Sequence, residues 1–213
     1  ANATSLLSML MSQGVNLTEL HLQPHSSRLE DLISGKTDAM ACYLSNEPYQ
    51  LDQAKIPYRV FNPADYGFSS YGDLLFTSEE QITRHPQRTR AFYAATIKGW
   101  QWAFDHIEEA AQLIYARYNT QDKTLDSLIF EGTVLKQLAL GPDQKIGPID
   151  RDKVDRILEL YRLTGQANGH TNGLDQAIDP LGFNKSELKI GILAHRGNRK
   201  ALERWTPLLT YLN

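Results

Sequence analysis

Polar and aromatic residues gather where an apolar run of the chain breaks, and this stretch has the most capacity for chemistry. The run Ala39–Leu44 gives way to Ser45, Asn46, Glu47 and Pro48. Asn46 is a favourable N-cap and Pro48 suits a first helical turn, whose free N–H groups and dipole attract polar or anionic ligand atoms. The Glu47 carboxylate can accept two hydrogen bonds from an amidine-like ligand or an amino-heterocycle, or it can simply complement the helix dipole.

Four tyrosines crowd the same part of the chain, at positions 43, 49, 66 and 71. Aromatic faces with phenol tips can stack on a planar ligand and orient it, whereas packing at a domain surface is the alternative for each tyrosine taken singly. A loop rich in glycine and serine, residues 65–70, lies between the last two tyrosines. The predicted ligand-binding residues are Tyr43, Asn46, Glu47, Tyr66, Gly67 and Tyr71.

Catalytic and metal-binding patterns are missing from the sequence. The six histidines are spread without the paired spacing of a metal site, and there is no P-loop, G-x-S-x-G or G-x-G-x-x-G motif. The single cysteine, Cys42, lies inside the apolar run, where a thiol usually acts as an inert small hydrophobe. We therefore expect binding rather than catalysis, with no catalytic residue, no metal and no cofactor.

Composition limits the class of protein. The chain has 213 residues, of which 41% are hydrophobic and 22% charged, and its formal net charge is −3. This is the balance of a globular protein, and scattered Lys and Arg with a negative net charge give no surface for nucleic acid. No apolar stretch approaches the roughly 20 residues that cross a membrane.

Hydrophobic patterning predicts an α/β fold. The segments Val15–His25 and Thr37–Leu44 are predicted as strands, and the helix between them is capped by Ser27 and ended by Gly35, which gives a βαβ unit with a parallel sheet. Ligands bind beyond the carboxyl ends of such strands, which is where Tyr43, Asn46 and Glu47 fall. Further short strands are predicted over 58–61 and 74–77. Helices are predicted over 47–54, 125–140 and 152–163. Another helical run is predicted to begin at Ser78 and to be divided at Pro86, with a long helical pattern from Gln87.

The chain is predicted to divide into a first domain over residues 1–165, a linker over 166–186 and a short module over 187–213. The linker is rich in Gly, Asn, Asp and Pro, and the module has one buried-type strand and one amphipathic helix. A lone strand and helix cannot bury a core, so we expect them to pack on the first domain, on residues beyond this sequence, or on a second copy in a homodimer.

Several segments together resemble a known family of binding proteins. They are SRLEDLISGKTDAMACYLSNEP, DYGFSSYGDLLFTS, HPQRTRAFYAATIKGWQWAFDHIEEA and IDRDKVDRILELY. The series is similar to the second lobe and C-terminal helices of periplasmic proteins that capture thiamine pyrimidine precursors. The resemblance implies a partial type 2 periplasmic binding protein fold, one lobe with a parallel or mixed sheet plus C-terminal helices, and a pyrimidine-like solute as ligand. Relatives that synthesise the pyrimidine carry a cysteine-rich iron motif, whereas this sequence has Cys42 alone.

The tail SELKIGILAHRGNRKALERWTPLLTYLN resembles the opening strand and helix of phosphonate-type binding proteins. Two binding modules in tandem imply the extracytoplasmic sensor region of a membrane-anchored signalling protein, such as a sensor histidine kinase or a diguanylate cyclase. A solute-binding component of an ABC transporter is the alternative, and a pyrimidine precursor synthase is the second alternative. The remainder of the membrane-anchored parent protein is then an expected partner, and the expected location is periplasmic or extracytoplasmic.

Overall fold

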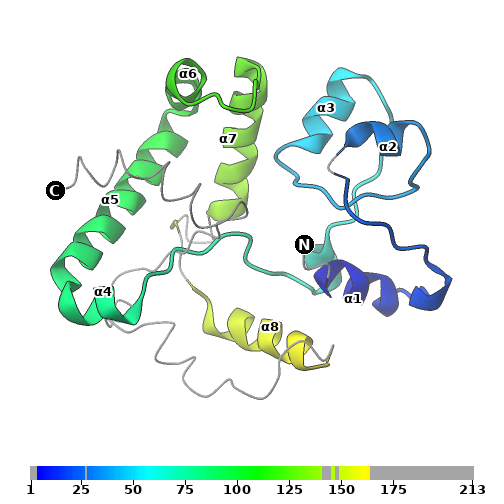
Figure 1. The fold of residues 1–213 in the computed structure, drawn as a ribbon, viewed down its shortest axis with the longest axis horizontal. Helices are drawn as coiled ribbons and strands as arrows, with labels where there is room; N and C mark the ends of the chain where they lie inside the picture. Colours follow the sequence, from blue (N-terminus) through cyan, green and yellow to red (C-terminus); the bar gives the residue numbers. More distant parts are fainter. Residues whose placement is uncertain (1–3, 27, 141–144, 147–148, 164–213) are drawn as a thin grey trace.

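Helices and connecting loops make up the part of the chain that the structure describes (Figure 1). The structure, a computed structural model, describes residues 4–26, 28–140, 145–146 and 149–163. Its helical elements, in chain order, are α1 (Thr4–Ser12), η1 (Leu17–Glu19), α2 (Leu29–Ile33), α3 (Glu47–Gln53), η2 (Pro63–Tyr66), α4 (Glu79–Arg84), α5 (Pro86–Asp105), α6 (Ile107–Arg117), α7 (Leu125–Ala139) and α8 (Arg151–Leu163).

Local sequence signals set most helix ends. The Ser78 hydroxyl accepts a hydrogen bond from Gln81 N at 3.2 Å at the start of α4, and the Thr124 hydroxyl accepts one from Ser127 N at 3.2 Å at the start of α7. The Asp150 carboxylate accepts one from Lys153 N at 3.2 Å and caps α8. These bonds satisfy N–H groups that the first turn leaves without a partner. The predicted helices over 47–54, 78–84, 125–140 and 152–163 are therefore present, while Ser27, the predicted cap of α2, lies outside the described residues.

The long helical run predicted from Gln87 is divided in two. His106 ends α5 with φ −133° and ψ 54°, which is outside the helical region, and its Nδ1 atom lies 2.9 Å from Trp102 O. Trp102 O also accepts a hydrogen bond from the backbone N–H of His106 at 2.9 Å, so backbone and ring of His106 both contact the carbonyl at the end of α5. Apolar periodicity continues across the break because both helices contribute to one packed group, so periodicity alone did not reveal it.

The predicted α/β fold with a parallel or mixed sheet is wrong for the described residues. They contain no named strand, and Leu140 and Ile146 form the isolated antiparallel bridge. Segment 15–25 holds η1 and irregular backbone, and segment 37–44 is irregular and mostly exposed rather than covered on both faces. Backbone groups here have partners other than a neighbouring strand, for example Asp31 O for Thr37 N at 3.0 Å and His25 Nε2 for Ala41 O at 2.7 Å.

The other predicted strands are irregular as well. Val60 is 45% exposed and Phe76 is 68% exposed, so neither 58–61 nor 74–77 has its apolar side chains against a second layer. A strand needs neighbouring strands for its ladder and a covering layer for its apolar face. The described part of the chain supplies neither at these positions, and β-type patterning therefore did not produce a sheet.

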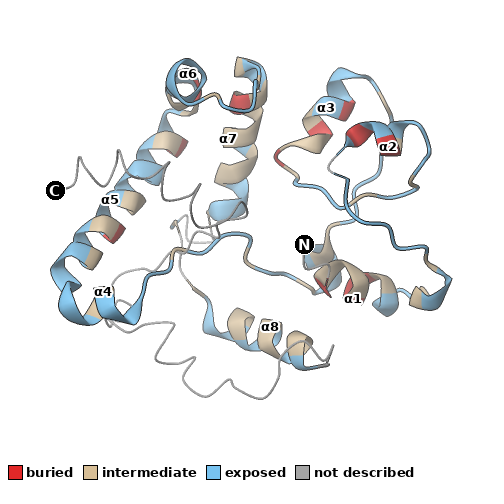
Figure 2. Cartoon of the chain, in the orientation of Figure 1, coloured by how far each residue is buried: buried red, intermediate tan, exposed pale blue. Residues whose placement is uncertain are grey.

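Packing is concentrated in a helical group formed by α5, α6 and α7, whereas α1 packs on η2 in the N-terminal part. Figure 1 shows α3 beside α7, with the first three helices on one side of the molecule and α4 to α7 on the other. Buried apolar side chains are few and are distributed over both parts (Figure 2): Met9, Leu29, Leu51, Tyr93, Phe104, Ala111 and Leu128.

Gly132 shows how closely α6 and α7 approach. A Cβ atom built at Gly132 of α7 would lie 3.0 Å from Cγ2 of Ile107, the first residue of α6. The missing side chain therefore lets the two helices pack at short range. The predicted linker 166–186 and module 187–213 lie outside the described residues. In the part of the chain that is described, no helix has the length and apolarity needed to cross a membrane.

Candidate ligand-binding site

Glu47 organises the loop that enters α3. Its carboxylate accepts a hydrogen bond from Tyr43 N at 2.9 Å through Oε2 and a longer one from the Asn46 side-chain amide at 3.3 Å through Oε1. Asn46 N in turn donates to Tyr43 O at 2.9 Å. Residues 43–47 thus form a closed turn in which the Glu47 side chain binds the backbone at Tyr43. We call these residues the Tyr43–Glu47 loop.

Asn46 lies at the N-cap position of α3, as predicted, but its side chain does not make the hydrogen bond of an N-cap. Asn46 precedes the first residue of α3 and Pro48 lies in its first turn, yet the Asn46 side chain makes no capping hydrogen bond. It donates to Glu47 instead. Pro48 and Leu51 are buried, so apolar contacts anchor the first turn of α3. In the loop before it Tyr43 is exposed, Ser45 is buried, and Asn46 and Glu47 are half-buried.

Tyr43 offers an open aromatic surface, because the residue is 62% exposed. Its neighbour Cys42 is also largely exposed, but burial around the sulfur and, second, the nearby Glu47 carboxylate raise the pKa of the thiol. A thiol that resists ionisation is a poor nucleophile. The loop therefore combines an exposed ring, an amide and a carboxylate, which can stack on and hydrogen-bond a planar ligand.

The other predicted residues lie elsewhere. Tyr66 is 37% exposed at the end of η2, and Gly67 follows it with φ +88°, a left-handed conformation that glycine adopts at no steric cost. The η2 turn packs on α1. Among the described residues, no hydrogen bond or ring contact joins Tyr66 or Gly67 to the Tyr43–Glu47 loop.

Tyr71 contacts the start of α8. Its phenol oxygen accepts a hydrogen bond from Asp150 N at 2.7 Å, and Lys153 Nζ lies 4.2 Å from the centre of its ring. Burial raises the pKa of the Tyr71 phenol and lowers the pKa of the Lys153 ammonium. The structure therefore brings Tyr43, Asn46 and Glu47 together and leaves Tyr66, Gly67 and Tyr71 in two other places.

Tyr49, the remaining tyrosine of the group, has a packing role. Its ring lies on α3 with its centre 5.3 Å from that of Phe130 on α7, at an interplanar angle of 44°. The separation of the ring centres is within the range of favourable aromatic pairs. Tyr49 thus connects the helix that follows the candidate site to the group of α5, α6 and α7.

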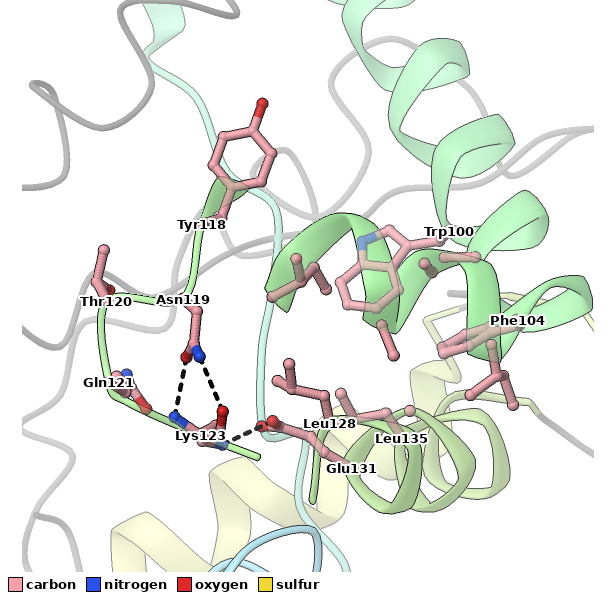
Figure 3. Close-up of a pocket in the computed structure, with 16 residues that line it drawn as sticks. Trp100, Phe104, Tyr118, Asn119, Thr120, Gln121, Lys123, Leu128, Glu131 and Leu135 are labelled. Atoms are coloured by element: carbon pink, nitrogen blue, oxygen red, sulfur yellow. Dashed lines mark hydrogen bonds and ion pairs between the residues drawn. The ribbon is translucent and has the colours of Figure 1, made fainter. Parts of the chain in front are cut away.

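A second region that the sequence did not single out is a cavity of about 310 Å³ within that helical group (Figure 3). Trp100 and Phe104 of α5 form part of its wall, and Lys123 and Glu131 form an ion pair at its edge. Trp100 and Trp102 both lie on the long helix α5, where an aromatic residue can face either a core or a ligand. No group of three or more His, Cys, Asp or Glu residues that could hold a metal occurs among the described residues.

Comparison with known proteins places the chain in a family. Residues 1–110 match the family described as NMT1/THI5 like, and the chain belongs to it. A curated relative is the formylaminopyrimidine-binding protein of Halalkalibacterium halodurans, which is 24% identical over 162 residues. The alignment covers 74% of this chain and 49% of that protein, so the chain spans about half the length of this relative.

The family resemblance drawn from the sequence is therefore confirmed at the level of the NMT1/THI5-like family. The matched residues include α1, α2, α3, η2 and the Tyr43–Glu47 loop. The family match ends at residue 110, and the phosphonate-type resemblance of residues 187–213 stays a prediction.

Proposed function

We propose that the protein binds a small planar solute of the aminopyrimidine class and does not catalyse its conversion. Membership of the NMT1/THI5-like family, with a curated relative whose name states formylaminopyrimidine binding, is the observation that carries this proposal. The raised pKa of the only cysteine thiol supports binding over catalysis.

The Tyr43–Glu47 loop is the proposed contact surface. The exposed ring of Tyr43 would stack on the solute, and the Glu47 carboxylate would accept hydrogen bonds from its amino group. Of the two hydrogen bonds that the Glu47 carboxylate accepts, the one from Asn46 to Oε1 is the longer, at 3.3 Å. A ligand that binds Oε1 therefore replaces the weaker of the two bonds. Asn46 would then be released to offer its own amide to the solute.

Tyr66, Gly67 and Tyr71 belong to the proposal as a second contact surface. They would meet the solute only after a movement of the loop over residues 65–73, because the described structure leaves them apart from Glu47. The positive φ of Gly67 gives that loop a turn which most other residues adopt only with strain.

We further propose that this region senses solutes outside the cytoplasm, in the periplasm, as part of a membrane-anchored signalling protein. The support is the sequence of the tail, which resembles a second binding module that a free transport protein does not need. The second candidate is a solute-binding component of an ABC transporter, and solute binding is what the name of the curated relative states. The coding sequence downstream of Asn213 separates them, since a sensor requires a membrane span and an output domain there, and a nearby stop codon contradicts it.

Calorimetric titration with a small aminopyrimidine and its N-formyl derivative tests the binding proposal. Loss of one hydrogen bond to a charged group typically costs about 1.5–3 kcal/mol, so Glu47→Ala should weaken binding by at least about tenfold. The matched control is Glu108→Ala, an exposed first-turn glutamate of α6. Equal affinities for both variants and the unchanged protein would show that the Tyr43–Glu47 loop is not the site.

A further inference from the structure

The cavity within α5, α6 and α7 has the size and lining of a small-molecule site. Its volume of about 310 Å³ is at the lower end of the roughly 300–1,000 Å³ range of ligand pockets. The three helices and the loop that precedes α7 line it (Figure 3). It is distinct from the Tyr43–Glu47 loop, since no residue of that loop is part of its lining.

One wall of the cavity is aromatic and aliphatic. The rings of Trp100 and Phe104 have their centres 5.3 Å apart with an interplanar angle of 40°. Ile107 of α6 and Leu128 and Leu135 of α7 continue the apolar lining. Trp100 is 37% exposed, so part of its side-chain surface is accessible to a ligand. Such a wall favours a flat, apolar ring.

The opposite edge carries one fixed pair of charges. Lys123 Nζ lies 2.6 Å from Glu131 Oε2, and the two side chains are only 18% and 28% exposed. Asn119 fixes the backbone of Lys123 on both sides, because Lys123 N donates to Asn119 Oδ1 at 2.9 Å and Asn119 Nδ2 donates to Lys123 O at 2.8 Å. The ammonium and the carboxylate are therefore held beside the cavity in a defined position (Figure 3).

Both members of this pair have hydrogen-bonding capacity left over. The Lys123 ammonium has three N–H groups and donates one to Glu131, while the Glu131 carboxylate keeps Oε1 and further lone pairs on Oε2. A donor thus lies directly next to an acceptor. The complementary ligand group has an acceptor next to a donor, as a primary carboxamide does.

We propose that this cavity binds a small aromatic carboxamide, at a site separate from the solute site at the Tyr43–Glu47 loop. The ring lies against Trp100, the carbonyl oxygen accepts a hydrogen bond from Lys123, and the amide N–H donates to Glu131. An aromatic carboxylate is disfavoured because Glu131 repels its second oxygen, and a plain hydrocarbon leaves the partly desolvated ion pair without new partners.

Benzamide is the probe for the test, with benzoate and toluene as comparison compounds. Binding is followed in the whole chain by the NMR signal of the Trp100 indole N–H, identified through Trp100→Phe. Benzamide should shift this signal saturably and leave that of Trp102 in place, since Trp102 does not line the cavity and stacks on His106 instead. Benzoate and toluene should bind at least about tenfold more weakly.

Two variants and their controls decide the outcome. Lys123→Met removes the donor, and Ala103→Leu fills the cavity without touching the ion pair; each should weaken benzamide binding by at least about tenfold. The control variants Lys98→Met and Ala94→Leu alter exposed positions of α5 outside the lining of the cavity, and they should leave benzamide binding unchanged. If Lys123→Met unfolds the protein, Ala103→Leu alone supplies the test. No saturable shift, or equal binding of toluene and benzamide, would overturn the proposal.

Discussion

The phenol oxygen of Tyr71 accepts a hydrogen bond from the backbone N–H of Asp150 at 2.7 Å, across 79 positions of the chain. The same tyrosine has Lys153 Nζ 4.2 Å from the centre of its ring. Two contacts of different kinds thus join the loop after η2 to the first turn of α8. The Asp150 carboxylate also caps α8. Asp150 therefore stabilises the start of the helix and links it to Tyr71.

Tyr71→Phe should loosen the attachment of α8. The variant removes the acceptor for Asp150 N and keeps the ring under Lys153, so the expected loss is that of one hydrogen bond, about 1 kcal/mol. Urea unfolding measures the free energy, and amide exchange of Asp150 reports the local effect. Tyr66→Phe is the control, because the Tyr66 hydroxyl has no hydrogen-bond partner among the described residues. If both variants behave alike, the contact between Tyr71 and Asp150 does not stabilise the protein.

Glycine replacements should distinguish the close approach of α6 and α7 from ordinary helix propensity. Gly99→Ala in α5 places a methyl group in open space and should stabilise the protein by about 0.5–1 kcal/mol. Gly132→Ala gains the same propensity but meets Ile107 Cγ2 at 3.0 Å, so its net effect should be less favourable than that of Gly99→Ala by at least about 1 kcal/mol.

Thermal unfolding of both glycine variants gives the comparison directly. Equal stabilisation by the two replacements would mean that Ile107 adjusts freely and that the close approach of the helices carries no constraint.

Asp31 should make the stability of the α2 region depend on acid. Its carboxylate lies 3.0 Å from Arg28 Nη2 and 3.2 Å from Lys36 Nζ. The hydrogen bond from Ser26, opposed by burial and aided by Lys36 and Arg28, holds the pKa of Asp31 below its ordinary value of 3.8. A depressed folded pKa means that this stabilisation is complete above the unfolded value and is lost as the pH falls through the folded one.

The measurement for Asp31 is the free energy of unfolding against pH for the unchanged protein and for Asp31→Asn. The unchanged protein should be the more stable at neutral pH, and the difference should shrink below the ordinary pKa of 3.8. Asp38→Asn, at an exposed position, serves as control. A difference that stays constant in acid would contradict the assignment.

The Cys42 thiol offers a chemical probe of the Tyr43–Glu47 loop. Because burial and then the Glu47 charge raise its pKa, Glu47→Gln should lower that pKa and increase the thiolate fraction at a given pH. The rate of alkylation by iodoacetamide near neutral pH should therefore rise, while Glu30→Gln in α2 should leave it unchanged. A slower reaction in Glu47→Gln would show that the carboxylate does not face the thiol.

Helices could be predicted from the sequence because their signals are local. Ser78, Pro86 and Asp150 act on backbone groups within three residues, and each helix boundary that depends on them is where the sequence predicts it. Strands depend on partners far along the chain. The apolar segments around Val60 and Phe76 have the composition of strands, but the described residues provide no neighbouring strand and no cover.

For the candidate sites too, groups of residues close in sequence could be predicted and contacts between distant segments could not. Tyr43, Asn46 and Glu47 are four positions apart at most, so the sequence was sufficient to group them. The bonds of Tyr71 to α8 and the cavity beside Trp100 join segments that only the tertiary structure brings together. Periodicity could not reveal the cavity beside Trp100, since a helical aromatic pattern does not say whether the space that the ring faces is filled.

The ring contact between Tyr49 and Phe130 has an energetic consequence for both proposed sites. Tyr49 lies two residues after Glu47 on α3, and Phe130 lies directly before Glu131 on α7. A displacement of α3 that alters this contact changes the environment of a residue adjacent to the ion pair of the cavity. If a ligand at one site changes the affinity of the other site through this contact, thermodynamic linkage requires the reverse effect to have the same coupling free energy.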